Sequence, residues 1–147
     1  MSEPLVEVSK TIDAPAEEVW DALTSPAKLK SFFFGSDVVS DWKVGAPIRF
    51  RGEYEGKPYE DKGEIRSFEP EKRLAFSHYS PRSGAPDTPD SYNLVAFDLK
   101  PRGDKTEVTL SQGRLNGAPK AEDLKQKDQF AKNWTMVLDG LEKAVAH

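Results

Sequence analysis

Apolar residues recur with a helical spacing in one long stretch near the carboxyl end of the chain. Between residues 122 and 146 the large apolar side chains are separated by steps of four or three: Phe130, Trp134, Val137, Leu141 and Val145. At 100° per residue this spacing places them on one side of a helix. Asp139 and Lys143 fall on the other side, where they are spaced to pair. The pattern predicts one long amphipathic helix over residues 122–146, lying on an apolar surface.

Most of the remaining chain alternates between apolar and polar residues, which is the period-two pattern of strands with one buried face. The alternation predicts strands over residues 5–12, 48–54, 59–66, 74–79, 92–100 and 108–112. A further short segment, residues 38–42, allows either a strand or an ordered loop. The outward positions carry charged side chains such as Arg49, Arg51 and Glu64, so that face of the sheet should be solvated.

Two short helices are expected between the first strand and the others. Pro15 suits the first helical position, and Glu17 and Glu18 favour the positive end of the helix dipole. Ser25 is the expected N-cap of the second helix, and Gly35 ends it. Because helices and strands are separated along the chain, the fold class is α+β, with a curved antiparallel sheet closed by one long helix.

The strands at 48–54 and 59–66 are expected to form a hairpin through a tight connection at Gly56-Lys57. Pairing Tyr54 with Tyr59 sets these further pairs opposite each other: Gly52 and Asp61, Phe50 and Gly63, Ile48 and Ile65. This register keeps the inward residues of both strands on one face. The next strand then brings His78 near Gly63 and diagonal to Asp61.

The composition narrows the classes of protein that this chain can be. A length of 147 residues suits one domain over residues 1–147 with its own core. The net charge of −4, with interspersed signs, argues against a nucleic-acid partner. Because there is no Cys and there are only two His, we expect no disulfide, no metal and no cofactor. No apolar run approaches ~18 residues and the start lacks a targeting segment, so we expect no membrane span and a cytoplasmic protein.

A cavity is expected between the long helix and the sheet. Gly52 and Gly63 face it and leave either open volume or a bend that the sheet needs. On the helix, Gln126 and Asn133 either face the cavity or lie at its exposed rim. The side chains expected to line the site are mostly aromatic, with aliphatic and polar additions: Phe32, Phe33, Phe50, Tyr54, Tyr59, Asp61, Ile65, Phe76, His78, Tyr92, Phe97, Gln112, Phe130, Asn133, Trp134 and Val137.

Asp61 and His78 are the strongest pair of candidates for chemistry. If both face inward on neighbouring strands, their side chains can hydrogen-bond, which orients the imidazole and makes a candidate acid–base pair. Alternatively the pair anchors the polar end of a ligand, or Asp61 lies in water at the open end while His78 is a satisfied core residue. One usable His and one carboxylate fall short of a metal site.

Two further stretches are placed to meet a ligand or a partner. Phe32, Phe33 and Phe34 are consecutive, so a helix cannot turn all three to one side, and at least one should be exposed or at the cavity mouth. Residues 80–90 contain three prolines and a glycine and form a long polar connection. Such a connection is either a mobile lid or plain disorder.

Several stretches carry a resemblance to a known superfamily. In order along almost the whole chain, they are residues 11–23 (TIDAPAEEVWDAL), 63–65 (GEI), 73–76 (RLAF), 95–99 (VAFDL) and 106–110 (TEVTL), with Trp134, Leu138 and Leu141. On these residues the chain resembles the helix-grip superfamily of START-like and pathogenesis-related proteins. It is most similar to the branch homologous to the activator of the heat-shock-protein-90 ATPase.

The resemblance implies a strongly curved antiparallel sheet wrapped round the carboxyl-terminal helix, with a pocket that opens near the two small helices. Members of the superfamily bind varied, mostly apolar small molecules. A minority are enzymes, with no shared catalytic motif from which a residue could be transferred. This chain departs from the family pattern at His78, where an aromatic residue is frequent, and in its proline-rich residues 80–90.

Three functions stand as hypotheses. The favoured one is a non-catalytic carrier or sensor of a small apolar or amphipathic molecule. The second is a lyase, cyclase or hydrolase in which Asp61 and His78 move a proton. The third is a chaperone-interaction module with an exposed apolar patch, for example Phe32 to Phe34 with Trp42. Motifs of the common hydrolase, nucleotide-binding and metalloprotease classes are absent from the sequence, and the oligomeric state is left open.

Overall fold

The computed structural model describes residues 4–33, 35–81, 84, 86–116 and 121–145. Its elements follow the chain as β1 (Pro4–Ile12), α1 (Ala16–Thr24), α2 (Pro26–Phe32), β2 (Asp37–Ser40), β3 (Pro47–Tyr54), β4 (Lys57–Glu69), β5 (Arg73–His78), η2 (Pro89–Ser91), β6 (Asn93–Arg102), β7 (Lys105–Arg114), α3 (Ala121–Lys125) and α4 (Lys127–Val145). Within these residues, seven strands form one sheet in the order β1-β7-β6-β5-β4-β3-β2. Every neighbouring pair is antiparallel.

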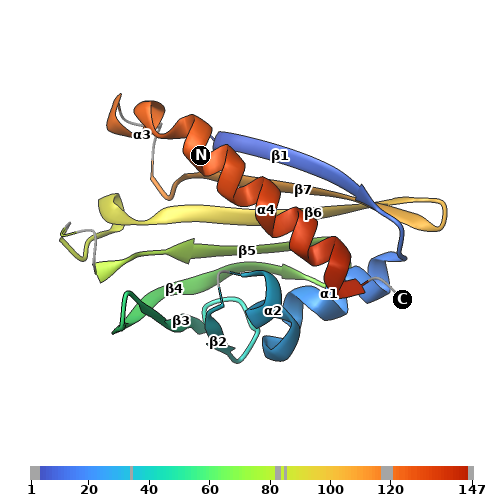
Figure 1. Ribbon diagram of the computed structural model, residues 1–147, viewed down its shortest axis with the longest axis horizontal. Helices are drawn as coiled ribbons and strands as arrows, with labels where there is room; N and C mark the ends of the chain where they lie inside the picture. Colours follow the sequence, from blue (N-terminus) through green and yellow to red (C-terminus); the bar gives the residue numbers. More distant parts are fainter. Residues whose placement is uncertain (1–3, 34, 82–83, 85, 117–120, 146–147) are drawn as a thin grey trace.

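Helix α4 crosses one face of the sheet diagonally, and α1 and α2 lie near its carboxyl-terminal end (Figure 1). The apolar side of α4 is buried as its spacing predicts, with Trp134 and Leu141 both turned into the core. On the opposite side of the same helix, the Met136 side chain is 67% exposed. The predicted α+β architecture, a curved antiparallel sheet gripping a long helix, is confirmed.

The expected single helix over residues 122–146 is divided at Gln126 into α3 and α4. In α3 the Leu124 side chain is 59% exposed, so this turn lacks an apolar residue that packs on the sheet. Instead, the guanidinium of Arg114 at the end of β7 holds the Asp123 carboxylate through contacts of 2.8 and 2.7 Å. The helix therefore bends where its contact changes from the sheet to this ion pair.

Asp139 does not form the expected pair with Lys143 on its own helix. The Lys10 ammonium of β1 lies 2.8 Å from the Asp139 carboxylate and 3.3 Å from that of Glu142. This is possible because α4 packs beside β1, so a lysine from the strand reaches the helix. These contacts raise the pKa of Lys10, and the hydrogen bond to Asp139 is the largest cause. The ion pair ties the helix to the edge of the sheet.

The β3–β4 hairpin has a register two residues away from the predicted one. Glu55 and Gly56 have φ of 52° and 79°, which are the positive values of a tight two-residue hairpin turn. This turn closes Tyr54 on Lys57, and it sets Phe50 opposite Asp61. The predicted connection at Gly56-Lys57 was one residue late. Because the shift is an even number, the residues expected to face inward still do so.

The inward glycines do not leave open volume beneath the helix. A Cβ built on Gly63 would lie 1.7 Å from the carbonyl oxygen of Ser77, so β5 approaches the backbone of β4 too closely for any side chain. A Cβ on Gly52 would lie 2.6 Å from the Tyr59 hydroxyl, whose ring fills that space. The expected open volume is therefore not there, and Gly63 is instead a position where β4 and β5 approach each other closely.

The two short helices and the edge strand β2 follow the prediction with small differences. Pro15 is the N-cap of α1 rather than its first residue. Ser25 is the N-cap of α2, but its side chain makes no capping hydrogen bond. Gly35 takes a φ of 70° shortly after α2 ends. Residues 37–40 pair with β3 as a strand, and Trp42 lies beyond it.

The described part of the connection at 80–90 lies against the outward face of the sheet. The Lys62 ammonium is 2.5 Å from the Asp87 carboxylate, and the Tyr92 hydroxyl donates to the same carboxylate over 2.7 Å. The rings of Tyr79 and Tyr92 stack at 5.1 Å. These contacts hold that part in place on the side of the sheet away from α4. No helix among the described residues is both long and apolar enough to cross a membrane.

Candidate functional site

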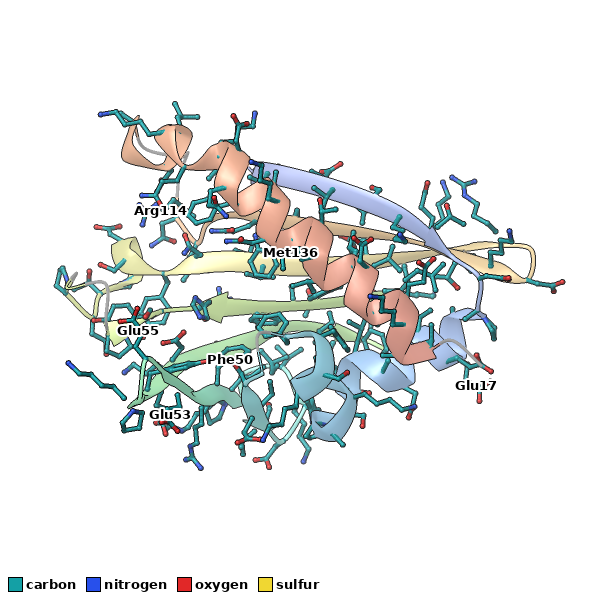
Figure 2. The ribbon with its side chains drawn as sticks, viewed as in Figure 1. Glu17, Phe50, Glu53, Glu55, Arg114 and Met136 are labelled. Atoms are coloured by element: carbon teal, nitrogen blue, oxygen red, sulfur yellow. The ribbon has the colours of Figure 1, made fainter. Side chains whose placement is uncertain are left out.

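A cavity of about 250 Å³ lies between α4 and the sheet. Strands β3 to β7, the segment after α2 and the amino-terminal half of α4 all contribute to its wall. Its lining is Phe33, Ser36, Phe50, Tyr59, Asp61, Phe76, His78, Asn93, Val95, Gln112, Phe130, Asn133 and Trp134. Figure 2 shows Phe50 on the sheet side of this region, with Met136 on the helix that covers it.

Aromatic rings make most of the apolar wall and touch one another. Phe33 stacks on Phe50 with ring centroids 5.5 Å apart, and Phe50 lies 5.3 Å from Phe76. Phe33 also lies 6.0 Å from Trp134, which joins the wall of the sheet to that of the helix. Such ring contacts contribute stability beyond the area they bury, so the rings of this wall hold one another in place.

The indole of Trp134 is held in one orientation by a side chain from the sheet. Its Nε1–H donates to the Gln112 carbonyl oxygen over 2.5 Å, and both side chains are buried. Gln112 lies opposite Val95 in the β6–β7 pairing, so it projects from the same face as the other lining residues. Because an indole can only donate, the hydrogen bond also fixes which end of the Gln112 amide points at the helix.

Asp61 and His78 meet inside the cavity. The His78 Nε2 atom is 3.1 Å from an Asp61 carboxylate oxygen, and Asp61 is 6% exposed. The Phe50 ring lies 5.4 Å from the imidazole and Phe50 is the register partner of Asp61. The hydrogen bond that the sequence allowed is therefore formed, at the junction of the aromatic wall with the polar part of the lining. The alternative with Asp61 in open water is wrong.

Three residues line the cavity although the sequence did not predict them as site residues. Ser36 is 3% exposed and its hydroxyl lies 2.8 Å from that of Tyr59. It belongs to an irregular segment with no periodicity that could have revealed it. Asn93 and Val95 share the inward face of β6 with Phe97, so the alternation along that strand already contained the signal for both.

Several predicted lining residues lie elsewhere. Phe32, Ile65 and Val137 are sealed in the core and do not border the cavity. Phe97 borders only a gap of about 10 Å³, roughly the room for one water. Tyr92 lies on the opposite face of the sheet, because β6 turns Asn93 rather than Tyr92 inward.

The remaining expectations concern the segment after α2 and the start of α4. Phe33 borders the cavity and Phe32 packs on α4, so both are buried. Phe34 and the Tyr54 side chain lie outside the described residues. Gln126 is exposed at the end of α3, as expected for an amide outside the cavity. Asn133 borders the cavity, as expected for an amide that faces it.

A second, polar pocket of about 370 Å³ lies on the outward face. Its charged side chains neutralise one another in pairs, such as Lys62 with Asp87 and Arg66 with Glu64. The hydrogen bond from Lys62 is the main reason that the pKa of Asp87 is lowered, and the same contact raises the pKa of Lys62. Burial raises the pKa of the Tyr92 phenol, and its hydrogen bond to Asp87 adds to this. Among the described residues, no cluster of three or more His, Asp or Glu could hold a metal.

A curved antiparallel sheet that grips a long helix over an aromatic cavity defines the helix-grip class of ligand-binding folds. A sequence model of the family described as "Activator of Hsp90 ATPase homolog 1-like protein" matches residues 13–146. The chain belongs to this family, whose members commonly bind ligands. The predicted branch of the superfamily is thereby confirmed.

Solved structures agree with this assignment. ChR145 from Cytophaga hutchinsonii is 40% identical, with a TM-score of 0.78 over 94% of this chain and 90% of that one. CalU16 from Micromonospora echinospora is 24% identical, with a TM-score of 0.70 over 95% and 74% of the two chains. The Aha1 dimer from Colwellia psychrerythraea is 19% identical, with a TM-score of 0.70 over 95% and 94%. At these identities, the likeness of CalU16 and of the Aha1 dimer to this chain is one of fold alone. A comparison with curated protein sequences found no match.

Proposed function

We propose that this protein binds a small, mostly apolar molecule with a polar end in the cavity between α4 and the sheet, as a non-catalytic carrier or sensor. One observation carries the proposal: about 250 Å³ of space is walled by aromatic rings, and its polar groups are few and already oriented. Ligand sites in proteins are typically concave, apolar and largely preformed, with a small number of polar groups that set the ligand's orientation.

The polar groups of the lining are held by defined partners. Asp61 with His78 and Ser36 with Tyr59 form two hydrogen-bonded pairs, both of which include a residue of β4. Gln112 is engaged by the Trp134 indole. A bound molecule would place its apolar body against Phe33, Phe50 and Phe76 and direct its polar end toward these pairs.

Two measurements test binding directly. Native mass spectrometry of freshly purified protein should reveal a co-purified small molecule, and apolar dyes should raise the melting temperature, because a ligand that prefers the folded state stabilises it. Asn133→Phe should fill the cavity from α4 and abolish the shift. Met136→Phe is the matched control, since it places the same ring on the exposed side of the same helix. Equal shifts in both variants would place binding outside the cavity.

The Asp61–His78 contact favours a second candidate, an enzyme that moves a proton as a lyase, cyclase or hydrolase. With Asp61 ionised, Nε2 of His78 carries the donated hydrogen, and Nδ1 of the neutral ring is then the basic nitrogen. The test is exchange of a carbon-bound proton, next to a ketone, for deuterium in heavy water. His78→Gln should stop any exchange that the unaltered protein supports, whereas exchange that survives the substitution would remove His78 from such a reaction.

Interaction with a chaperone stays a prediction from the family description alone. The apolar patch expected for it is not formed by the described residues of its segment, because Phe32 and Phe33 are buried and Trp42 is half-buried against the core. A pull-down of purified heat-shock protein 90 with this protein would test the interaction. Equal recovery of the chaperone with and without the protein would count against it.

A further inference from the structure

We propose that the ligand of this cavity carries a protonated amine. The inference rests on the proposed function, that the cavity holds a small molecule, and it adds the charge of that molecule. Its basis is the set of ionisable groups in the lining. Among the described residues that border the cavity, Asp61 supplies a carboxylate and His78 an imidazole, and there is no Lys or Arg.

This set of groups offers nothing to an anionic ligand. With Asp61 ionised, the Asp61–His78 pair has a charge of −1 when His78 is neutral, and the two charges cancel when His78 is protonated. In neither state does the lining have a net positive charge. A carboxylate ligand would therefore lose its hydration without finding an unmatched cation, and burying such a charge is strongly unfavourable.

A cation, by contrast, finds two kinds of partner. The first is the Asp61 carboxylate, which is 6% exposed, so its attraction for a nearby positive charge is weakly screened by solvent. The second is the group of aromatic rings beside it, because the negative face of a ring attracts a cation within about 6 Å. Phe50 connects the two, since it lies opposite Asp61 in the hairpin and packs against His78.

The cationic side chains of β3 and β4 lie outside the cavity, so they do not offset the negative charge of Asp61 there. Arg49, Lys62 and Arg66 border the pocket on the opposite face of the sheet, since they alternate with the inward residues of β3 and β4. There, Lys62 is already paired with Asp87 and Arg66 with Glu64. Strands β3 and β4 thus turn these three positive charges outward, while Asp61 of β4 faces inward.

The volume limits the rest of the ligand. An apolar cavity of about 150 Å³ accommodates a benzene ring, so the 250 Å³ found here suits one aromatic ring with a short chain. An arylalkylamine has this size, with its ring against the aromatic wall and its ammonium toward Asp61. This is the class of ligand for which the cavity is complementary in both shape and charge.

Three probes of nearly equal shape and different charge test the inference. They are 2-phenylethylamine, 2-phenylethanol and phenylacetate, measured by isothermal titration calorimetry near pH 7. We expect the amine to bind about tenfold more tightly than the alcohol, a difference of ~1.4 kcal/mol. Phenylacetate should bind most weakly. If the alcohol or the acid binds as tightly as the amine, the inference is overturned while the proposed function stands. If none of the three binds, both are overturned.

A matched pair of variants locates the preference. Asp61→Asn keeps the shape of the side chain and removes its charge, so the amine should lose its roughly tenfold advantage over the alcohol. Glu53→Gln removes one negative charge from an exposed position of β3 and should change neither affinity (Figure 2). An amine preference that survives in Asp61→Asn overturns the proposal. Circular dichroism checks that the variants fold, and if Asp61→Asn does not, the three-probe comparison in the unaltered protein decides.

Discussion

The two halves of α4 rest on the same sheet with different results. In the carboxyl-terminal half, Leu138, Leu141 and Val145 are buried in a closed core. In the amino-terminal half, Phe130, Asn133 and Trp134 border the cavity. The short helices account for the difference, because α1 and α2 contact α4 and lie near its carboxyl-terminal end (Figure 1). Where α1 and α2 pack against α4 the interior is solid, and toward the amino-terminal half of α4, beside the segment after α2, a space is left.

The carboxyl-terminal half should carry the stability of the fold. Leu141 is 0% exposed, so Leu141→Ala should lower the free energy of unfolding by about 3 kcal/mol, through lost burial and the new cavity. Urea denaturation measures this. Met136→Ala on the exposed side of the helix should change it by less than about 0.5 kcal/mol. Equal losses at the two positions would contradict the division of α4 into a core half and a cavity half.

In the amino-terminal half of α4, the packing of the helix on the sheet depends on a buried hydrogen bond. Gln112→Leu removes the carbonyl that accepts from the buried Trp134 indole, and this should cost about 2 kcal/mol of unfolding free energy. It should also weaken the binding of apolar dyes, because the indole loses its fixed orientation. The double variant Gln112→Leu with Trp134→Phe should recover part of the stability, as no donor then remains to satisfy. Additive losses would show that the two side chains act independently.

The contact between α2 and α4 is tested by a smaller change. A Cβ on Gly140 would lie 2.5 Å from the Cβ of Phe32. Alanine improves helix propensity by ~1 kcal/mol over glycine, but overpacking costs ~1–3 kcal/mol. We therefore expect Gly140→Ala to lower the free energy of unfolding by about 1 kcal/mol. In a Phe32→Ala background the same substitution should become neutral or stabilising. Stabilisation in the unaltered background would mean that α2 moves aside freely.

The smallest effect concerns the outward face. The pKa of Asp87 is lowered, chiefly by its hydrogen bond from Lys62, so its contribution to stability is present at neutral pH and is lost as the pH falls through that lowered value. The melting temperature of the unaltered protein should thus exceed that of Asp87→Asn slightly at pH 7, and the two should converge well below about pH 4. Ligand binding in the cavity should be unaffected. A difference that persists in acid would rule out the ion pair as its source.

Periodicity predicted the faces of the elements better than their registers. It placed Asp61 and His78 on the same side of neighbouring strands, and they hydrogen-bond there. It misplaced the β3–β4 pairing because the turn uses Glu55 in a positive-φ conformation, which the residue type does not announce. An error of two residues leaves the faces correct. Tyr92 was assigned to the wrong face, because the alternation that turns Val95 and Phe97 inward turns Tyr92 outward.

Lining residues were predicted less well than inward residues, for a physical reason. Ile65, Phe97 and Val137 have the same alternation or helical spacing as Phe76, Val95 and Trp134, yet only the second group borders the cavity. Whether an inward side chain meets a neighbour or a space depends on what packs over it. That is decided by elements distant in the sequence.

The chain by itself determined the period of each element, the side that each turns inward and the family to which it belongs, because these depend on residue type and near neighbours. The tertiary structure alone decided which inward residues enclose a space, that Ser36 joins them and that one carboxylate lies within reach of several aromatic rings. Those features arise where α2, α4 and the sheet meet, and the packing of separate elements is not encoded in any local pattern.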